Sequence, residues 1–164
     1  MREPGTYALV IALGIELRLR IGKLGTYNLS PGYYVYVGSA LGGLSGRLKR
    51  HLRSEKKSHW HIDYLLQQAA VNEIWYAIGR DKLECKWNAI LTNLPDAIPS
   101  VPGFGASDCR CFSHLTYFQV TPSFVIFKQI VEQETLPQVC QLNEPSFNRI
   151  GSRWTYLVQG HRST

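Results

Sequence analysis

The segment GYYVYVGSALGGLSGRLKRHLR, residues 32–53, constrains the fold more than any other part of the chain. It begins with aromatic and β-branched residues, which are typical of a strand. Glycines then interrupt the strand, and Leu44, Leu48 and Leu52 recur at the spacing of the buried side of a helix. The pattern therefore predicts a strand joined by a tight turn to a helix that packs on the same sheet. We expect Ser45 to cap this helix.

Other segments alternate between strand and helix patterns within a length of 164 residues, which suits one domain. Residues 6–13 read as a buried strand, and residues 15–21 as a half-exposed strand that follows a turn at Gly14; residues 22–32 read as a loop. The remaining pattern predicts helices over residues 61–69, 82–94 and 122–134, and strands over residues 71–78, 113–120 and 152–160. The strand over residues 113–120 is expected at the edge of the sheet.

Positive charge is concentrated in one short segment. The chain has a net charge of +6, and residues 46–57 contribute +5 of it through Arg47, Lys49, Arg50, Arg53, Lys56 and Lys57 against Glu55. Such a localised basic field is typical of a protein that binds the phosphate backbone of nucleic acid, although a solvated helix face is the simpler alternative. Arg47 and His51 lie one turn apart beside the leucine stripe, so we expect both near the sheet.

Composition narrows the environment of the protein. Hydrophobic residues make up 45% of the chain and charged residues 18%, as in a globular domain. The longest apolar run, YALVIALGI, is too short to cross a bilayer and lacks the features of a signal peptide. Four cysteines in a chain of this length do not form a disulfide scaffold. We therefore expect a cytoplasmic protein without a membrane partner.

Several motifs occur in an order that resembles a known nuclease superfamily. GTYALVI begins at Gly5, YVG begins at Tyr36, Arg47 and His51 follow on the basic helix, and Glu84 opens a later helix. This order resembles the GIY-YIG nuclease superfamily. The segments GYYVYVGSA, RLKRHLR, HWHIDYLL, LEC and GFGASDCRCFSHL are more similar still to its branch called the domain of unknown function 123 family.

The resemblance spans roughly Gly5 to Phe118 and implies an α+β fold with a small central antiparallel or mixed sheet flanked by helices. It also suggests a GIY-YIG-like nuclease domain over residues 1–118. Residues 119–164 would then form a C-terminal extension that packs on the same domain.

The resemblance also implies a role for five residues. Glu84 would bind a single Mg²⁺ or Mn²⁺ ion, since a carboxylate is a hard oxygen ligand. Tyr7 would activate the attacking water, and Tyr36 would position that water or the phosphate. Arg47 would stabilise the charge that develops on the phosphate, and His51 would share proton transfer or hydrogen-bond the phosphate.

Each of these residues also has an ordinary structural explanation. Tyrosines are common in sheets, an arginine is usually a surface residue, a histidine can pack beside leucines, and a glutamate favours the first turn of a helix. The interval between the two tyrosine motifs, residues 8–35, is also longer than is usual in the superfamily. A second GTY at Gly25 lies closer to YVG, but NLSPG follows it, which is unsuitable for the apolar strand that the first motif begins.

A group of cysteines and histidines forms a second candidate site. Cys85, Cys109, Cys111 and His114, together with His59 and His61, provide soft ligands for zinc. The single residue between Cys109 and Cys111 differs from the usual zinc-knuckle spacing, which favours buried thiols that pack the loop on the core. A third possibility is that His61 and Asp63 line the same cleft as Glu84, because the related branch carries them together.

These observations support two functional hypotheses. The first is a divalent-metal-dependent endonuclease that hydrolyses phosphodiester bonds in DNA, with structured or damaged DNA as its substrate. Its backbone contacts would come from Lys49, Arg50, Arg53, Lys56 and Lys57. The alternative is a catalytically inactive nucleic-acid-binding module that assists DNA repair or recombination.

Overall fold

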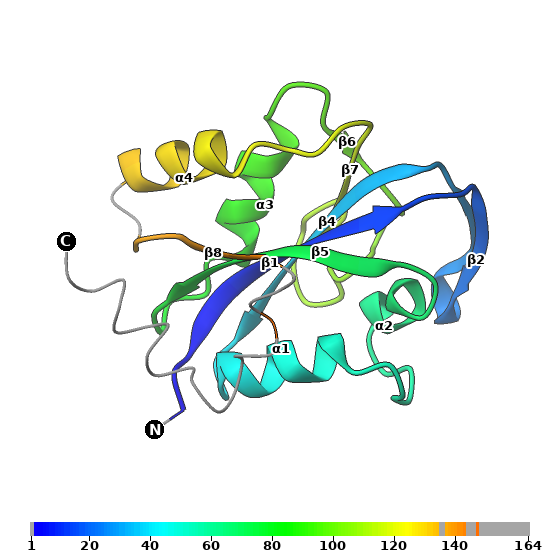
Figure 1. Cartoon of the computed structure of the whole chain (residues 1–164), viewed down its shortest axis with the longest axis horizontal. Helices are drawn as coiled ribbons and strands as arrows, with labels where there is room; N and C mark the ends of the chain where they lie inside the picture. The colour runs from blue at the N-terminus through cyan, green and yellow to red at the C-terminus, as the bar shows by residue number, and fades with distance from the viewer. Residues whose placement is uncertain (1, 135–136, 144–146, 148–164) are drawn as a thin grey trace.

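A central antiparallel sheet lies between two pairs of helices in the computed structural model (Figure 1), which describes residues 2–134, 137–143 and 147. The strands are β1 (Gly5–Leu13), β2 (Leu17–Ile21), β3 (Gly25–Leu29), β4 (Gly32–Ala40), β5 (Ala70–Ile78), β6 (Ile98–Pro99), β7 (Leu115–Phe118) and β8 (Cys140–Asn143). The helices are α1 (Leu44–Leu52), α2 (His61–Leu66), α3 (Glu84–Thr92) and α4 (Phe124–Gln133), with a 3-10 turn over Gly22–Leu24.

The main sheet has six strands in the order β6-β7-β4-β1-β5-β8, and every pairing in it is antiparallel. β1 occupies the middle, where it pairs with β4 from Gly5–Ala40 to Leu13–Gly32. Its side chains are apolar on both faces because helices cover both sides of the sheet. This arrangement confirms the α+β fold with a central antiparallel sheet that the sequence motifs implied.

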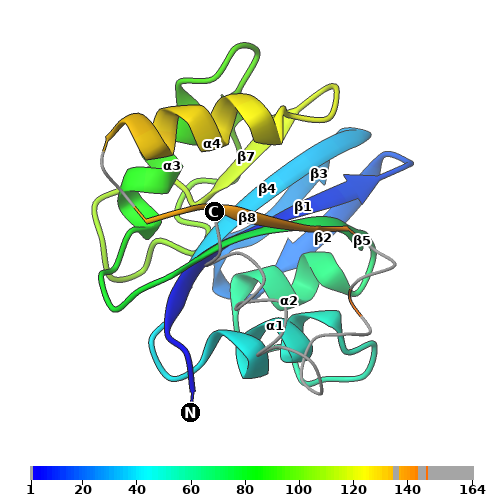
Figure 2. The same cartoon turned by 60° about the vertical axis from the view of Figure 1, so that its left-hand side comes forward.

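Each face of the sheet has its own hydrophobic core. On one face, Leu9 of β1 packs with Leu48 of α1 and Leu65 of α2. On the other face, Trp75 of β5 packs with Trp87 of α3 and Phe127 of α4. Figure 2 shows the two helix pairs on opposite sides of the strands. The alternation of side chains along each strand thus decides which helix pair a residue meets.

The structure corrects three local predictions. Residues 25–29, expected within a loop, form β3, which pairs with β2 in a separate two-stranded sheet because alternate side chains face inward. Ser45 does not cap α1; the cap position is Gly43, whose φ of 134° favours glycine. β7 is also not the outermost strand, since the two residues of β6 pair with it. The strand expected over residues 152–160 lies outside the described residues.

The later part of the chain contributes to both the sheet and the second core. β8 pairs with β5. Phe127 and Val131 of α4 are buried against the face of the sheet that α3 also covers. Among the helices that the structure describes, none has the length and apolar character needed to cross a membrane.

Candidate active site

A cleft of about 470 Å³ lies beside the second half of β4. Three layers of the fold contribute to it: β4 in the sheet, α1 and the start of α2 on one face, and the start of α3 on the other. Its polar side chains include Tyr36, Arg47, His61, Lys82, Glu84 and His114. Residues that are distant in sequence therefore share one solvent-accessible space.

The cleft opens at the point where β4 is no longer paired with β7. β7 pairs with β4 only over Tyr33 to Tyr36, and the N–H of Val37 donates the next hydrogen bond to the carbonyl oxygen of His114 at 3.2 Å. Beyond this point Gly38 and Ser39 line the cleft. Because the sheet is not continued there, side chains from both of its faces can reach the same cleft.

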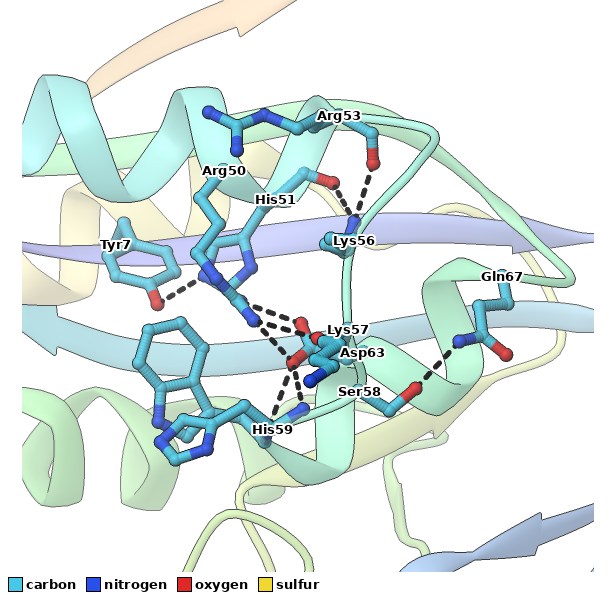
Figure 3. A network of polar contacts seen from close by, with 11 residues as sticks. Tyr7, Arg50, His51, Arg53, Lys56, Lys57, Ser58, His59, Asp63 and Gln67 are labelled. Atoms are coloured by element: carbon cyan, nitrogen blue, oxygen red, sulfur yellow. Dashed lines mark hydrogen bonds and ion pairs between the residues drawn. The ribbon is translucent and has the colours of Figure 1, made fainter.

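Tyr7 lies on β1 directly beneath this cleft and is completely buried. Its hydroxyl group shares a hydrogen bond of 2.7 Å with Nε2 of His51 (Figure 3), and its ring meets the ring of Tyr36 edge-on at 6.3 Å between centroids. The position opposite on β4 is Gly38, where a Cβ atom would lie 2.6 Å from the Tyr7 oxygen. A glycine at residue 38 therefore makes room for the Tyr7 hydroxyl.

Burial shifts the pKa values of the Tyr7–His51 pair in opposite directions. It raises the pKa of Tyr7 to about 12, although the positive charge of Arg47 acts to lower it. Burial and the charge of Arg47 together lower the pKa of His51 to about 3. Both groups are consequently neutral near pH 7. Burial, followed by the neighbouring Tyr7, also holds the pKa of Tyr36 well above its usual value.

Arg47 is held over the cleft by two contacts. Its Nη1 group donates a hydrogen bond of 3.2 Å to the carbonyl oxygen of Ser39, and its guanidinium lies 4.4 Å from the centre of the Trp60 ring. These contacts fix the direction of a planar, permanently charged group. Arg47 also lines the cleft, where its guanidinium can donate hydrogen bonds to an anion.

Glu84 is the first residue of α3 and reaches the cleft from the opposite face of the sheet. Its Oε2 atom is buried and accepts no hydrogen bond from any described residue. Leaving a buried carboxylate oxygen unpaired is costly. A hard divalent cation is a suitable partner, because Mg²⁺ is commonly bound by one or two carboxylates together with water and substrate phosphates.

Arg50 and Asp63, both expected to face nucleic acid or the cleft, pair with each other instead (Figure 3). Both nitrogen–oxygen distances are 2.8 Å, and the guanidinium also lies 4.1 Å from the Trp60 ring centre. Asp63 further accepts the backbone N–H groups of His59 and Trp60 at the start of α2. Burial alone would raise the pKa of Asp63, but these donors outweigh it and bring the pKa to about 2.

The other basic residues divide into two groups. Lys49, Arg53 and Lys57 are exposed. Lys56 instead donates hydrogen bonds to the carbonyl oxygens of His51 and Arg53, at 2.9 and 2.8 Å, and so caps the end of α1. The side chains of these three exposed residues are therefore accessible to solvent, whereas that of Lys56 is held by the chain itself.

His59 and His61 both line the cleft. The N–H of Gly105 donates a hydrogen bond of 2.9 Å to Nδ1 of His61. This contact assigns the proton of the neutral ring to Nε2, because Nδ1 acts as the acceptor. His61 can thus present an N–H donor to a ligand in the cleft.

The second candidate site is a compact cluster next to the cleft. Cys85, Cys109, Cys111 and His114 each place one ligand atom within 4.8 Å of all the others. His114 also lines the cleft, and Cys85 follows Glu84 directly in α3. His59 and His61 are not members of this cluster.

Sequence reasoning missed three contributors to the site. Trp60 supplies the surface under both Arg47 and Arg50, Gly38 supplies the space for Tyr7, and Lys82 lines the cleft. Trp60 lies within the quoted HWHIDYLL motif, and a tryptophan between two histidines was the available signal. The positions of Gly38 and Lys82 in the site depend on how distant segments of the chain pack together, which the local sequence does not show.

One family model covers all of these segments. The family model described as "Domain of unknown function DUF123" matches residues 6–135, which include every residue named above as lining the cleft. The match continues beyond Phe118 through α4. No curated protein and no solved structure matches the chain. The chain belongs to the DUF123 family.

Proposed function

We propose that this protein is a GIY-YIG-type, divalent-metal-dependent endonuclease that hydrolyses phosphodiester bonds in DNA. The observation that carries the proposal is the shared cleft of Tyr36, Arg47 and Glu84, with the Tyr7–His51 pair directly beneath it. These residues come from β1, β4, α1 and α3, which are distant in sequence, so the fold brings them together. Their types match those that the motif order implied.

Arg47 would hold the scissile phosphate and stabilise the negative charge that grows on it. A guanidinium forms directional hydrogen bonds with phosphate oxygens, and its contacts with Ser39 and Trp60 orient it before substrate binds. Such preorganised donors commonly contribute about 10²–10³ in rate. Arg47 would therefore affect turnover more than affinity.

Glu84 would hold the divalent ion through the carboxylate oxygen that has no partner among the described residues. When bound there, Mg²⁺ or Mn²⁺ would supply Lewis-acid polarisation of the phosphate and stabilisation of the leaving oxygen. The nearby His61 N–H and Lys82 ammonium could then bind the other phosphate oxygens.

Tyr7 and Tyr36 would manage the attacking water. Tyr36 faces the cleft and would position the water, while Tyr7 would accept the water's proton at its phenolic oxygen as its own proton passes to Nε2 of His51. Burial opposes this step by holding the pKa of Tyr7 at about 12, whereas the charge of Arg47 assists it. His51 would take up the Tyr7 proton through the 2.7 Å hydrogen bond.

DNA is the proposed partner because the exposed cations Lys49, Arg53 and Lys57 cluster on the segment that also carries Arg47. Each phosphate neutralised by such a cation releases counterions, so binding should weaken as salt rises. The small surface offers little base readout, which favours structured or damaged DNA over a long specific sequence.

The decisive experiment is cleavage of plasmid and branched DNA with Mg²⁺ or Mn²⁺, comparing the wild type with Glu84→Gln. We expect cutting by the wild type only with a divalent ion and a loss of at least about 100-fold in Glu84→Gln. DNA binding and the circular dichroism spectrum should stay unchanged. Glu16→Gln is the matched control, since Glu16 is exposed outside the cleft.

Full activity of Glu84→Gln would refute the role of Glu84. A wild type that binds all of these DNAs but cuts none would refute the nuclease proposal and support the second candidate function. That candidate is a nucleic-acid-binding module without turnover that assists DNA repair or recombination. One specific observation favours it: Tyr7 is fully buried, so bulk water does not reach its hydroxyl in this conformation.

A further inference from the structure

Three cysteines and a histidine converge beside the cleft from two separate parts of the chain. Cys85 lies in the first turn of α3, whereas Cys109, Cys111 and His114 lie in the loop before β7. Their ligand atoms all lie within 4.8 Å of one another. We propose that Cys85, Cys109, Cys111 and His114 bind one Zn²⁺ ion in a closed structural site.

The separations between ligand atoms suit a tetrahedral zinc ion. With Zn–S of about 2.3 Å and Zn–N of about 2.0–2.1 Å, tetrahedral geometry requires ligand atoms roughly 3.5–3.8 Å apart. The Sγ atoms of Cys109 and Cys85 lie 3.4 and 3.8 Å from Nε2 of His114. Only small side-chain movements would therefore bring the four atoms to coordinating positions.

Backbone hydrogen bonds hold the ligand loop in this shape independently of any ion. The N–H of His114 donates to the carbonyl oxygen of Phe104 at 2.7 Å, and the N–H of Gly103 donates to that of Phe112 at 2.8 Å. The carbonyl of His114 in turn accepts the N–H of Val37 on β4. The loop is thus fixed to the sheet on one side of the cluster.

A buried side-chain contact also docks the loop on α3. Nδ2 of Asn88, one turn after Cys85 on the same helix, donates a hydrogen bond of 2.8 Å to the carbonyl oxygen of Ser113. Ser113 is itself held by its hydroxyl, which donates to the carbonyl oxygen of Ser100. The two chain segments that supply the ligands are consequently preorganised against each other, which lowers the entropy lost on metal binding.

The donor set selects zinc over the hard ion proposed at Glu84. Thiolates and imidazole are soft to borderline ligands, whereas Mg²⁺ and Mn²⁺ prefer oxygen. Four protein ligands leave no open position for a substrate water, as in structural zinc sites. The single residue between Cys109 and Cys111 differs from the spacing of a zinc knuckle, in which two neighbouring cysteines form one half of the site. That spacing rule does not apply here, because the fourth ligand, Cys85, comes from a distant helix.

The proposed zinc would fix the start of α3 to the cleft wall. Cys85 follows Glu84 directly, and His114 lines the cleft that Glu84 reaches. Coordination of both would restrain the helix turn that carries the Glu84 carboxylate. This consequence for Glu84 rests on the proposed nuclease function, whereas metal binding by the cluster does not.

The test measures metal in the full-length protein without DNA. We expect about one zinc per chain after purification under reducing conditions, because a Cys₃His set forms one complete tetrahedral site. Replacement by Co²⁺ should give intense visible d–d absorption, which reports tetrahedral geometry, and a near-ultraviolet band from thiolate-to-cobalt charge transfer. Cys109→Ser and Cys111→Ser should each lower zinc content at least about tenfold.

Cys140→Ser is the matched control, since Cys140 lies on β8 outside the cluster and should keep full zinc content. Because a ligand variant could fail to fold, the wild type is also stripped of metal and titrated with Co²⁺. Recovery of the tetrahedral spectrum supports the site. Folded wild type that binds neither Zn²⁺ nor Co²⁺, or equal zinc loss in Cys140→Ser and Cys109→Ser, would overturn it. Since no DNA is present, the result is separate from the nuclease test.

Discussion

The hydroxyl oxygen of Tyr7 and the Nε2 atom of His51 lie 2.7 Å apart in the interior between β1 and α1. Neither side chain exposes more than 2% of its surface. The pair thus combines a phenol whose pKa is raised with an imidazole whose pKa is lowered, and both remain uncharged near neutral pH. This neutral polar pair lies at the base of the proposed active site.

His51 should make the protein sensitive to mild acid. Its folded-state pKa is about 3, while an unfolded chain has the ordinary histidine value of about 6.5. Its stabilising contribution is complete above the unfolded value and is lost as the pH falls, because only the unfolded chain then binds a proton. Between about pH 6.5 and pH 3, the free energy of unfolding should fall by up to about 1.4 kcal/mol for each unit by which the pH is lowered.

Urea unfolding of the wild type and His51→Gln at about pH 7, 6 and 5 measures this effect. The glutamine cannot titrate, so the variant should lose less stability with falling pH than the wild type. Equal pH slopes for the two proteins would contradict the assignment.

Tyr7→Phe should slow DNA cleavage by about 100-fold or more, the usual contribution of a positioned acid or base, and leave DNA affinity unchanged. Removing the hydroxyl abolishes the proposed proton acceptor without emptying the packed ring position. Single-turnover cleavage and binding titrations separate the two effects. Tyr27→Phe is the control, because Tyr27 belongs to the other GTY segment and its hydroxyl donates a hydrogen bond to the nearby carbonyl oxygen of Leu24. An unchanged rate in Tyr7→Phe would dismiss Tyr7 as the base.

Arg47→Ala should lower the cleavage rate by about 10²–10³ while weakening DNA binding only slightly. Arg53→Ala should do the opposite, with weaker binding and a salt dependence reduced by about one counterion, because Arg53 is exposed on the same segment. Measuring rate and affinity at several salt concentrations distinguishes the two. Equal losses of rate at both positions would argue against a special role for Arg47.

Gly38→Ala should destabilise the fold by about 1–3 kcal/mol, as expected for overpacking. The added Cβ would lie 2.6 Å from the Tyr7 oxygen and 2.8 Å from Cζ of the same ring. Gly46→Ala is the matched control: beyond its own helix turn, no atom of the described residues lies within 4 Å of its added Cβ, and alanine is favoured within a helix by up to about 1 kcal/mol. Thermal unfolding should shift downward in the first variant and upward in the second; a stable Gly38→Ala protein would contradict the close packing of Tyr7.

Asp63→Asn should reduce the free energy of unfolding by on the order of 2 kcal/mol, because it neutralises the buried carboxylate that accepts charge-assisted hydrogen bonds from the partly exposed Arg50. Glu132→Gln provides a surface comparison, since the Lys128–Glu132 pair is partly exposed and such helix pairs contribute only about 0.3–0.5 kcal/mol. Denaturant unfolding near pH 7 compares the two. Similar small losses in both variants would show that Asp63 has no such structural role.

The strands and helices near the site were largely readable from local pattern. Tyr34 and Tyr36 face the first core and Val35 and Val37 the second, which agrees with the alternation of side chains along a strand. The helix predicted over residues 82–94 corresponds to α3, and its apolar residues Leu83, Trp87, Ile90, Leu91 and Leu94 are buried. The structure of the glycine-rich segments was harder to predict. Gly25 begins a strand, and Gly43, instead of Ser45, precedes α1. A glycine or proline in the sequence indicates a turn, but it does not show which strand the next segment will pair with.

Composition, periodicity and motif order were enough to determine the alternation of strands and helices, the basic segment, and the residues worth testing. Only the tertiary structure decided which charges remain free, because Arg50 pairs with Asp63 across thirteen residues while Arg53 stays exposed. It also decided that Cys85 joins Cys109, Cys111 and His114, and that Tyr7 lies beneath the cleft and not in it. The physical reason is that burial and pairing depend on contacts between distant segments, which strand register and helix docking create.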